Sequence, residues 1–360
     1  LDYWWMDAGW YRNETGWPNV GTWEVDTGRF PGGLRAITDH THKRGVGSIV
    51  WFEPERVTRG TWIFDEHPEW LLGSGNDWLL DLGNPEALQW LTDHVDALIE
   101  NQGIDLYRQD FNTDPLDRWR AHDAALATGG QDRQGITEIR YVTGLLAFWD
   151  ELRRRHPSML IDTCASGGRR NDVETLRRAI PLHRSDYIIE PLSQQCQTFG
   201  ISSWIPVHGT GTKGEDAYSI RSTRVPCLNA VWDVRRHDLD YDLLRRMIGE
   251  WRRIAPFLVG DYYPLVSYSL APDAWAAWQY DRPDLGGGVV HAFRRADSPL
   301  ESAVFRLQGV DPGATYTVTN MDDESTEQCS GRELLAQGVA VSLQDRPGSA
   351  VVVYERCGGG

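Results

Sequence analysis

The chain has 360 residues, 41% of them hydrophobic, and a formal net charge of −16. That acidity argues against nucleic acid or an anionic membrane surface as a partner, and no run of residues approaches the roughly 20 apolar residues that a membrane helix needs. The 17 tryptophans and 13 tyrosines favour a carbohydrate ligand, because sugar rings stack on aromatic side chains, although most of these rings should fill the core.

The five cysteines are widely spaced and form no C-x-x-C pair. This spacing predicts neither a zinc site nor a disulfide scaffold, and we expect no metal and no cofactor. The chain begins without methionine and already within an apparent strand. We therefore expect it to be a fragment of a longer protein, and leave open both the compartment and the oligomeric state, a homo-oligomer included.

Short apolar runs alternate with helical patterns over the first 260 residues, which predicts a parallel α/β fold. Predicted helices cover 85–102, about 137–155 and 241–255. The first has Asn84 as its N-cap, Pro85 in its first turn and Gly103 as its stop. Strands are predicted at 2–7, 46–53, 104–111, 158–164, 180–186, 201–207 and 225–232.

Seven strands are one fewer than a (β/α)8 TIM barrel contains. We therefore expect residues 1–261 to form such a barrel without its first β/α unit. A doubly wound open sheet is the alternative, but no G-x-G-x-x-G motif follows the first strand.

After Pro264 the pattern changes to period two, with turns rich in Gly, Pro and Asp. Residues 262–357 should form a small antiparallel β-sandwich domain with one brief helix at 332–337, followed by a tail at 358–360. Its predicted strands are 273–281, 286–296, 301–308, 314–320 and 348–356.

Active-site groups of a barrel lie at the carboxyl ends of its strands. Acidic side chains dominate these ends and show no metal-ligand spacing, which favours carboxylate chemistry such as glycoside hydrolysis. In chain order the ends carry Asp7, Glu53 and Glu55, Arg108 and Asp110, Cys164 with Ser166-Gly167-Gly168, Arg184 and Asp186, and His208.

Asp110 and Asp186 are the best catalytic pair. Arg108 projects to the same side as Asp110 and should hold it ionised, as a nucleophile requires. A charged Asp110 would favour a protonated Asp186, which suits a general acid, whereas Arg184 would favour ionised Asp186. The sequence leaves these two effects open.

Each feature also has a structural explanation. Most Arg-x-Asp pairs on strands are structural ion pairs, and Ser166-Gly167-Gly168 is as readily a plain turn. The other structural interpretations are a buried apolar side chain for Cys164, a solvated loop for Glu53-Pro54-Glu55, and a core histidine for His208.

Taken together, the motifs resemble the melibiase family of α-galactosidases, glycoside hydrolase family 36, over about residues 1–260. The motifs are Asp7-x-Gly9-Trp10, Trp51-Phe52-Glu53-Pro54-Glu55-x-Val57, His67-Pro68-x-Trp70, Arg108-Gln109-Asp110, Cys164-x-Ser166-Gly167-Gly168-x-Arg170-x-Asp172 and Ser185-Asp186.

The resemblance implies a barrel between an N-terminal β-sandwich, absent here, and a C-terminal β domain. It also implies retaining hydrolysis of terminal α-galactosides without a metal, with Asp110 as nucleophile and Asp186 as acid/base. By the same resemblance, the sugar-binding residues are Asp7, Trp51, Arg108, Cys164 and Gly167.

Four positions depart from the family pattern and predict a changed glycone. Ala8 replaces a second aspartate, Arg108 replaces a lysine, and Arg184 stands where a small polar residue is typical. A sugar-binding arginine is replaced near Gly75-Asn76.

The sequence thus predicts a retaining exo-acting α-glycosidase for an α-galactoside or a modified relative such as an N-acetylgalactosaminide. Its two catalytic carboxyl groups should lie about 5–5.5 Å apart. A raffinose-synthase-type transglycosylase and a non-catalytic carbohydrate-binding barrel are the alternatives.

Overall fold

The computed structural model describes residues 1–12, 20–75, 77–128, 132–188 and 190–358. The chain forms two compact units, Leu1–Pro181 and Leu182–Gly360. Within the described ranges, no helix is both long and apolar enough to cross a bilayer. The predicted domain boundary between residues 261 and 262 falls within the second unit and stays a prediction.

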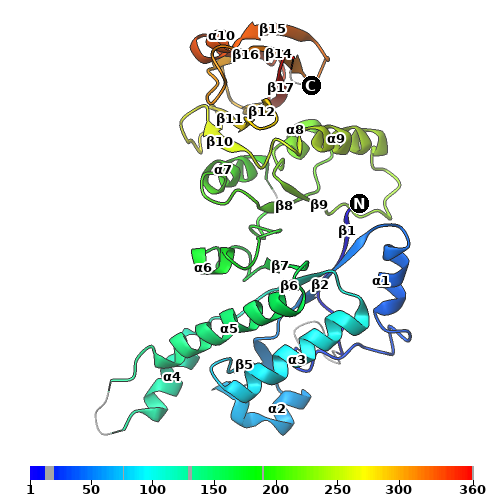
Figure 1. Ribbon diagram of the computed structural model, residues 1–360, viewed down its shortest axis with the longest axis vertical. Helices are drawn as coiled ribbons and strands as arrows, with labels where there is room; N and C mark the ends of the chain where they lie inside the picture. The colour runs from blue at the N-terminus through cyan, green and yellow to red at the C-terminus, as the bar shows by residue number, and fades with distance from the viewer. Residues whose placement is uncertain (13–19, 76, 129–131, 189, 359–360) are drawn as a thin grey trace. The chain divides into compact units, whose positions relative to one another are not determined.

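The first unit contains a four-stranded parallel sheet in the order β1-β2-β6-β7 (Figure 1). Trp51 on β2 pairs with Arg108 on β6, and Arg108 pairs with Asp162 on β7. These strands confirm the first four predicted ones and their parallel arrangement. Their bounds are Tyr3–Met6 (β1), Gly47–Phe52 (β2), Leu106–Gln109 (β6) and Leu160–Thr163 (β7).

The two longest helices of this unit, α3 and α5, pack side by side (Figure 1). The Asn84 side chain accepts a hydrogen bond from Glu86 N at 2.9 Å where α3 begins, and Gly103 ends it at φ 67°. Both signals were read correctly from the sequence. The helices are Arg35–His42 (α1), Trp62–Glu66 (α2), Pro68–Trp70 (the 3-10 helix η1), Pro85–Gln102 (α3), Leu116–Leu126 (α4), Ile136–Arg155 (α5) and Val173–Leu176 (α6).

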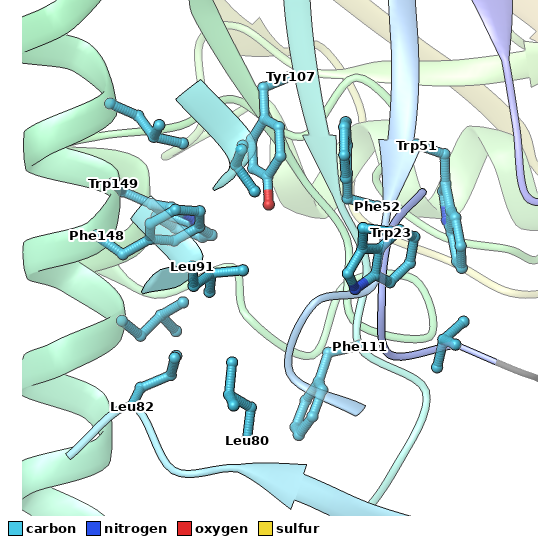
Figure 2. Close-up of a cluster of buried hydrophobic side chains, with 14 of the residues drawn as sticks. Trp23, Trp51, Phe52, Leu80, Leu82, Leu91, Tyr107, Phe111, Phe148 and Trp149 are labelled. Atoms are coloured by element: carbon cyan, nitrogen blue, oxygen red, sulfur yellow. The ribbon is translucent and has the colours of Figure 1, made fainter. Parts of the chain in front are cut away.

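One part of the core of the first unit lies between α5 and the parallel sheet. Figure 2 shows Phe148 and Trp149 of α5 directed towards Tyr107 of β6. All three side chains are fully buried, and burial of a large apolar side chain stabilises a fold by about 1.5–3 kcal/mol. Trp149 Nε1 and Tyr107 Oη both donate to Gln109 Oε1, at 2.7 and 2.9 Å. This core therefore fixes the last residue of β6, directly before Asp110.

A small antiparallel sheet in the order β3-β5-β4 follows β2 and precedes α3. It was not predicted, because strands of three and four residues are too short to show a period. Asn76, part of the departure noted at Gly75-Asn76, lies outside the described residues. The strands are Arg56–Thr58 (β3), Leu71–Ser74 (β4) and Asp77–Leu80 (β5).

The second unit begins with helices and one parallel strand pair, β8 with β9. The strand predicted at 225–232 is confirmed as β9, and the helix at 241–255 as α9. The bounds are Pro191–Ile201 (α7), Gly209–Thr212 (β8), Ala217–Arg221 (α8), Cys227–Ala230 (β9) and Tyr241–Ile254 (α9).

Two predicted strands are wrong. In 180–186 only Ile180 pairs, through an isolated parallel bridge to Asp162, and 201–207 starts at the end of α7 and continues as turns. The strand in this part of the chain is β8. Its alternating Gly and Thr residues contain no large apolar side chain, so the sequence did not indicate a strand there. Glycine is required at position 209, because a Cβ there would clash with the carbonyl of Leu182.

The rest of the second unit is antiparallel. A six-stranded sheet in the order β10-β11-β12-β17-β14-β15 is accompanied by the pair β13-β16. All five predicted strands and the brief helix are confirmed, whereas β10, β15 and β16 were missed. The elements are Asp261–Pro264 (β10), Trp275–Arg282 (β11), Gly287–Arg294 (β12), Ser302–Phe305 (β13), Thr315–Asn320 (β14), Thr326–Ser330 (β15), Gly331–Ala336 (α10), Val339–Ser342 (β16) and Gly348–Arg356 (β17).

Candidate active site

Four predicted site positions stand directly after the four strands of the parallel sheet. Asp7 follows β1, Glu53 follows β2, Asp110 follows β6 and Cys164 follows β7. Because the strands are parallel and adjacent, their carboxyl ends lie along one edge of the sheet. The fold of the first unit therefore brings these four residues to the same edge.

Asp110 accepts four hydrogen bonds from protein donors. Oδ1 accepts from Phe111 N at 2.7 Å and Ser166 N at 3.1 Å, and Oδ2 accepts from Asn112 Nδ2 at 2.9 Å and Trp51 Nε1 at 3.2 Å. The residue is 9% exposed. Burial raises the pKa of Asp110, but the Asn112 hydrogen bond and the positive charge of Arg108 outweigh it, so the pKa lies below its ordinary value. Asp110 is thus ionised at neutral pH.

Arg108 is buried and forms its ion pair with Asp162 on the neighbouring strand. The expectation that Arg108 helps to hold Asp110 ionised is supported, because its charge lowers the pKa of Asp110, although its ion-pair partner is Asp162. The guanidinium carbon lies 4.4 Å from the centre of the Trp5 ring, a cation–π contact. Arg108 is therefore held by a carboxylate and by an aromatic face.

Trp5 connects Arg108 to Asp7. Its Nε1 donates to Asp7 Oδ2 at 3.1 Å, while Ala8 N donates to Oδ1 at 2.9 Å. Asp7 itself is exposed. Sequence reasoning missed Trp5, although a residue two positions before Asp7 points to the same face of a strand.

Trp51 and Cys164 are each 2% exposed. Burial is the main cause that raises the pKa of the Cys164 thiol, and Gly167 N lies 3.4 Å from its Sγ. Ser166 has φ 47° and Gly167 φ 84°, so Ser166-Gly167-Gly168 is a tight turn. Its first backbone N–H is one of the donors to Asp110, a role that the sequence did not reveal.

Glu53 and Glu55 have fully buried side chains, so the interpretation of this segment as a solvated loop is wrong. Glu53 binds Arg56 at 2.5 Å and accepts from Asn112 N at 2.6 Å. Burial raises the pKa of Glu53, and the hydrogen bond from Arg56 opposes that shift.

Glu55 joins four parts of the first unit. Arg170 donates to its two carboxylate oxygens at 2.5 and 2.7 Å, Tyr141 Oη donates at 2.9 Å, and Gln109 Nε2 donates at 2.7 Å. These contacts connect the end of β2 with β6, with α5 and with the segment after β7. Glu55 thus has a structural role.

Asp186 belongs to the second unit, where its side chain is 61% exposed and lies 3.8 Å from His183 Nε2. The Arg184 guanidinium is buried and donates to Gln194 O and Oε1, both at 3.0 Å. Burial lowers the pKa of Arg184 to about 10. His208 is a buried core histidine, 3.4 Å from Arg184 Nη1 and 3.1 Å from Ser202 Oγ. Among the described residues, no group of three or more His, Cys, Asp or Glu side chains is arranged to hold a metal ion.

The comparisons with known families agree with the motifs. A family model described as Melibiase matches residues 1–217, and a model of the glycosyl hydrolase family 36 C-terminal domain matches residues 275–354. α-Galactosidase 1 of Pediococcus pentosaceus is 24% identical over 335 residues, which are 86% of this chain and 44% of that protein. α-Galactosidase Mel36A of Lactobacillus acidophilus is 25% identical over 355 residues, 92% of this chain and 47% of that protein. The chain thus spans about half the length of these curated relatives.

Solved structures of α-galactosidases show which fold the chain has. The α-galactosidase from Lactobacillus brevis superposes with a TM-score of 0.84 at 19% identity, covering 100% of this chain and 51% of that one. A variant of the α-galactosidase AgaA from Geobacillus stearothermophilus, solved in complex with raffinose, gives 0.83 at 19% identity over 99% and 51%. The chain has the fold of these enzymes, a TIM barrel followed by an antiparallel β domain, as predicted.

Proposed function

The chain belongs to the melibiase family, and from that premise we propose that it carries the catalytic residues of a retaining, exo-acting α-glycosidase for terminal α-galactosides. The observation that carries the proposal is the state of Asp110. It is a carboxylate held ionised by four donors at the carboxyl end of a parallel strand. An ionised, oriented carboxylate is the group that covalent glycoside hydrolysis requires.

In the first step, an Asp110 oxygen attacks the anomeric carbon while the glycosidic C–O bond breaks. Asp186 gives its proton to the departing oxygen, so a neutral alcohol leaves and a β-linked glycosyl ester remains on Asp110. In the second step, Asp186 takes a proton from water, whose oxygen attacks the anomeric carbon and releases Asp110. The two inversions together retain the α configuration.

The sugar contacts are proposed for Asp7, Arg108, Cys164 and Gly167. Asp7 is exposed at the edge that carries Asp110. Arg108 is buried on β6, two residues before Asp110. Trp51, proposed as a further contact, is buried with Nε1 directed to Asp110. It would therefore act on the sugar mainly by fixing the nucleophile. The glycone of the substrate is a galactosyl group or its 2-acetamido relative.

The first test measures the full-length protein on a panel of aryl α-glycosides, followed by Asp110→Gly and Asp186→Ala. We expect Asp186→Ala to lose about 10²–10⁴-fold in kcat and Asp110→Gly to lose more, because it lacks the nucleophile. The exposed Asp117 of α4 provides the control, and Asp117→Asn should keep the parent rate.

Added azide separates the two roles. It should rescue Asp110→Gly by giving the β-glycosyl azide, and Asp186→Ala by giving the α-glycosyl azide, because azide attacks opposite faces of the sugar in the two variants. A parent protein inactive on the whole panel would indicate a non-catalytic barrel. Excess acceptor sugar in the same assay reports transglycosylation, through the disaccharide formed.

A further inference from the structure

Two separate loops hold Asp110, and a single guanidinium joins them. The segment after β6 provides Phe111 N and Asn112 Nδ2, and the turn after β7 provides Ser166 N. Arg169 donates to carbonyl oxygens of both loops. Its Nη2 reaches Phe111 O at 2.9 Å and Thr113 O at 3.2 Å, and its Nε reaches Ala165 O at 2.9 Å. Three carbonyl groups from two loops therefore converge on one side chain.

The same guanidinium also orders the side chains between the loops. Arg169 Nη2 donates to Ser166 Oγ at 3.2 Å, and Ser166 Oγ donates to Asn112 Oδ1 at 2.9 Å. With its oxygen engaged in this way, the Asn112 amide directs Nδ2 to Asp110 at 2.9 Å. A continuous chain of hydrogen bonds thus runs from Arg169 to the nucleophile.

The backbone at Ser166 needs such support. Its φ of 47° places a non-glycine residue in the left-handed region, which L-residues other than Gly, Asn and Asp rarely occupy. Conformations of this kind persist when their surroundings hold them, and they concentrate at functional sites. Here the left-handed conformation directs the Ser166 N–H to Asp110 Oδ1, and the Arg169 contact to the adjacent Ala165 carbonyl fixes the start of the turn.

We propose that Arg169 is a positioning residue for the nucleophile: it joins the loops after β6 and β7 so that Asn112 and Ser166 both donate to Asp110. The inference rests on the proposed role of Asp110. A planar guanidinium can donate in several fixed directions at once, and a lysine ammonium cannot match that arrangement.

The surroundings of Arg169 separate this role from a contribution to folding. Its side chain is 43% exposed, and its ion-pair partner Asp114 is 92% exposed. An ion pair so accessible to water adds little stability. Removing the side chain should therefore leave the unit folded and loosen the donors of Asp110.

The experiment compares Arg169→Ala, Arg169→Lys and the control Arg154→Ala in the full-length protein. Arg154 is also an exposed, ion-paired arginine, on α5. We expect Arg169→Ala to lower kcat by about 10²-fold, because small displacements of a reacting group are costly, with KM little changed. The acid limb of its pH–rate profile should move to higher pH, since losing the Ser166 and Asn112 donors raises the pKa of Asp110. Arg169→Lys should resemble Arg169→Ala, and Arg154→Ala should match the parent.

Chemical rescue gives a readout that a structural role would not move. Free guanidinium ion at low millimolar concentration should restore part of the kcat of Arg169→Ala and shift its acid limb back towards the parent. Rates within twofold of the parent would overturn the inference. So would a loss of rate with an unshifted acid limb and no rescue.

A second measurement does not depend on activity. Amide hydrogen exchange in 164–168 should become faster in Arg169→Ala than in the parent or in Arg154→Ala. If the parent protein is inactive on every glycoside, the proposed function fails, and this exchange measurement still decides the role of Arg169. Unchanged exchange would refute it.

Discussion

At the scale of single residues, Asp110 shows two opposing effects on one carboxylate. Burial disfavours its charge, whereas four donors and a nearby guanidinium favour it, and the net effect lowers the pKa. The Asn112 amide is the largest of the stabilising causes. The charge state of the proposed nucleophile therefore depends on an amide that no motif indicated.

Replacing Asn112 by alanine should raise the pKa of Asp110. In the parent, Asp110 is ionised at every pH above its lowered pKa, so the rate falls only as the pH drops through that pKa. In Asn112→Ala the loss should begin at higher pH, which shortens the acid side of the kcat/KM profile. Asn101→Ala, on the exposed face of α3, is the control. An acid limb that stays in place or moves to lower pH would contradict this prediction.

Trp5 offers a test of the proposed sugar contacts of Asp7 and Arg108. Phenylalanine at position 5 keeps a ring over Arg108 but loses the hydrogen bond to Asp7, and leucine loses both. Because hydrogen bonds to charged groups contribute about 1.5–3 kcal/mol, we expect Trp5→Phe to weaken substrate binding about tenfold or more. Trp5→Leu should weaken it further. Michaelis constants on one aryl α-galactoside measure both, and equal constants in the two variants would refute the cation–π contribution.

Sequence reasoning expected Asp110 directly after a strand, but it did not show that Arg108 would form its ion pair with Asp162, for a geometrical reason. Residues two apart on one strand lie about 6.8 Å apart, whereas residues paired across neighbouring strands lie about 4.8 Å apart. Arg108 is paired laterally with Asp162, and that register is invisible in a single strand. Ser166 was missed for a related reason, since its function comes from a backbone N–H.

At the scale of elements, helices and strands were predicted correctly when they were long enough to repeat an apolar pattern. The helices α3 and α5, with 18 and 20 residues, repeat their apolar stripe over several turns and were placed correctly. The strands β3, β4 and β5 have only three or four residues, at most two periods of alternation, and β8 consists of glycine and threonine. Their formation depends on partners elsewhere in the chain.

The network around Glu55 fastens several of these elements together. Its side chain is fully buried and its partner Arg170 is 16% exposed, so removal of one partner leaves a buried charge unpaired. We expect Arg170→Met to lower the free energy of unfolding by about 3–5 kcal/mol, measured by urea denaturation. Arg154→Ala should change it by about 0.5 kcal/mol or less.

A double variant distinguishes pairing from packing in this network. Glu55→Gln combined with Arg170→Met should recover part of the lost stability, because no buried charge then remains unpaired. If the double variant instead lost as much stability as the two single variants added together, packing of the side chains would matter more than their charges.

At the scale of the whole molecule, the alternation of strands and helices correctly predicted the fold class, and the change to period two correctly predicted the antiparallel region. The two proposed catalytic carboxylates belong to different compact units, Asp110 to Leu1–Pro181 and Asp186 to Leu182–Gly360. Local patterns identified the strand that ends before Asp110, whereas the strand predicted at 180–186 before Asp186 is wrong. They also do not encode the separation of two carboxyl groups that are carried by different units.

The anomeric configuration of the first product indicates how far apart the two catalytic carboxyl groups lie. If the proposed mechanism holds, the first sugar released from an aryl α-galactoside is the α anomer, observed by NMR before mutarotation. This outcome corresponds to carboxyl groups about 5–5.5 Å apart. Release of the β anomer would indicate an inverting mechanism, with a gap of about 6.5–9.5 Å, and would exclude Asp110 as a covalent nucleophile.

The environment of Cys164 has a practical consequence for inhibitor chemistry. Thiol-directed electrophiles react with the thiolate, and burial beside ionised Asp110 keeps Cys164 in the protonated form. Cys357 is exposed and should consume iodoacetamide first, while activity persists. A covalent ligand directed at this site would therefore react more effectively with the carboxylate of Asp110 than with the neighbouring sulfur.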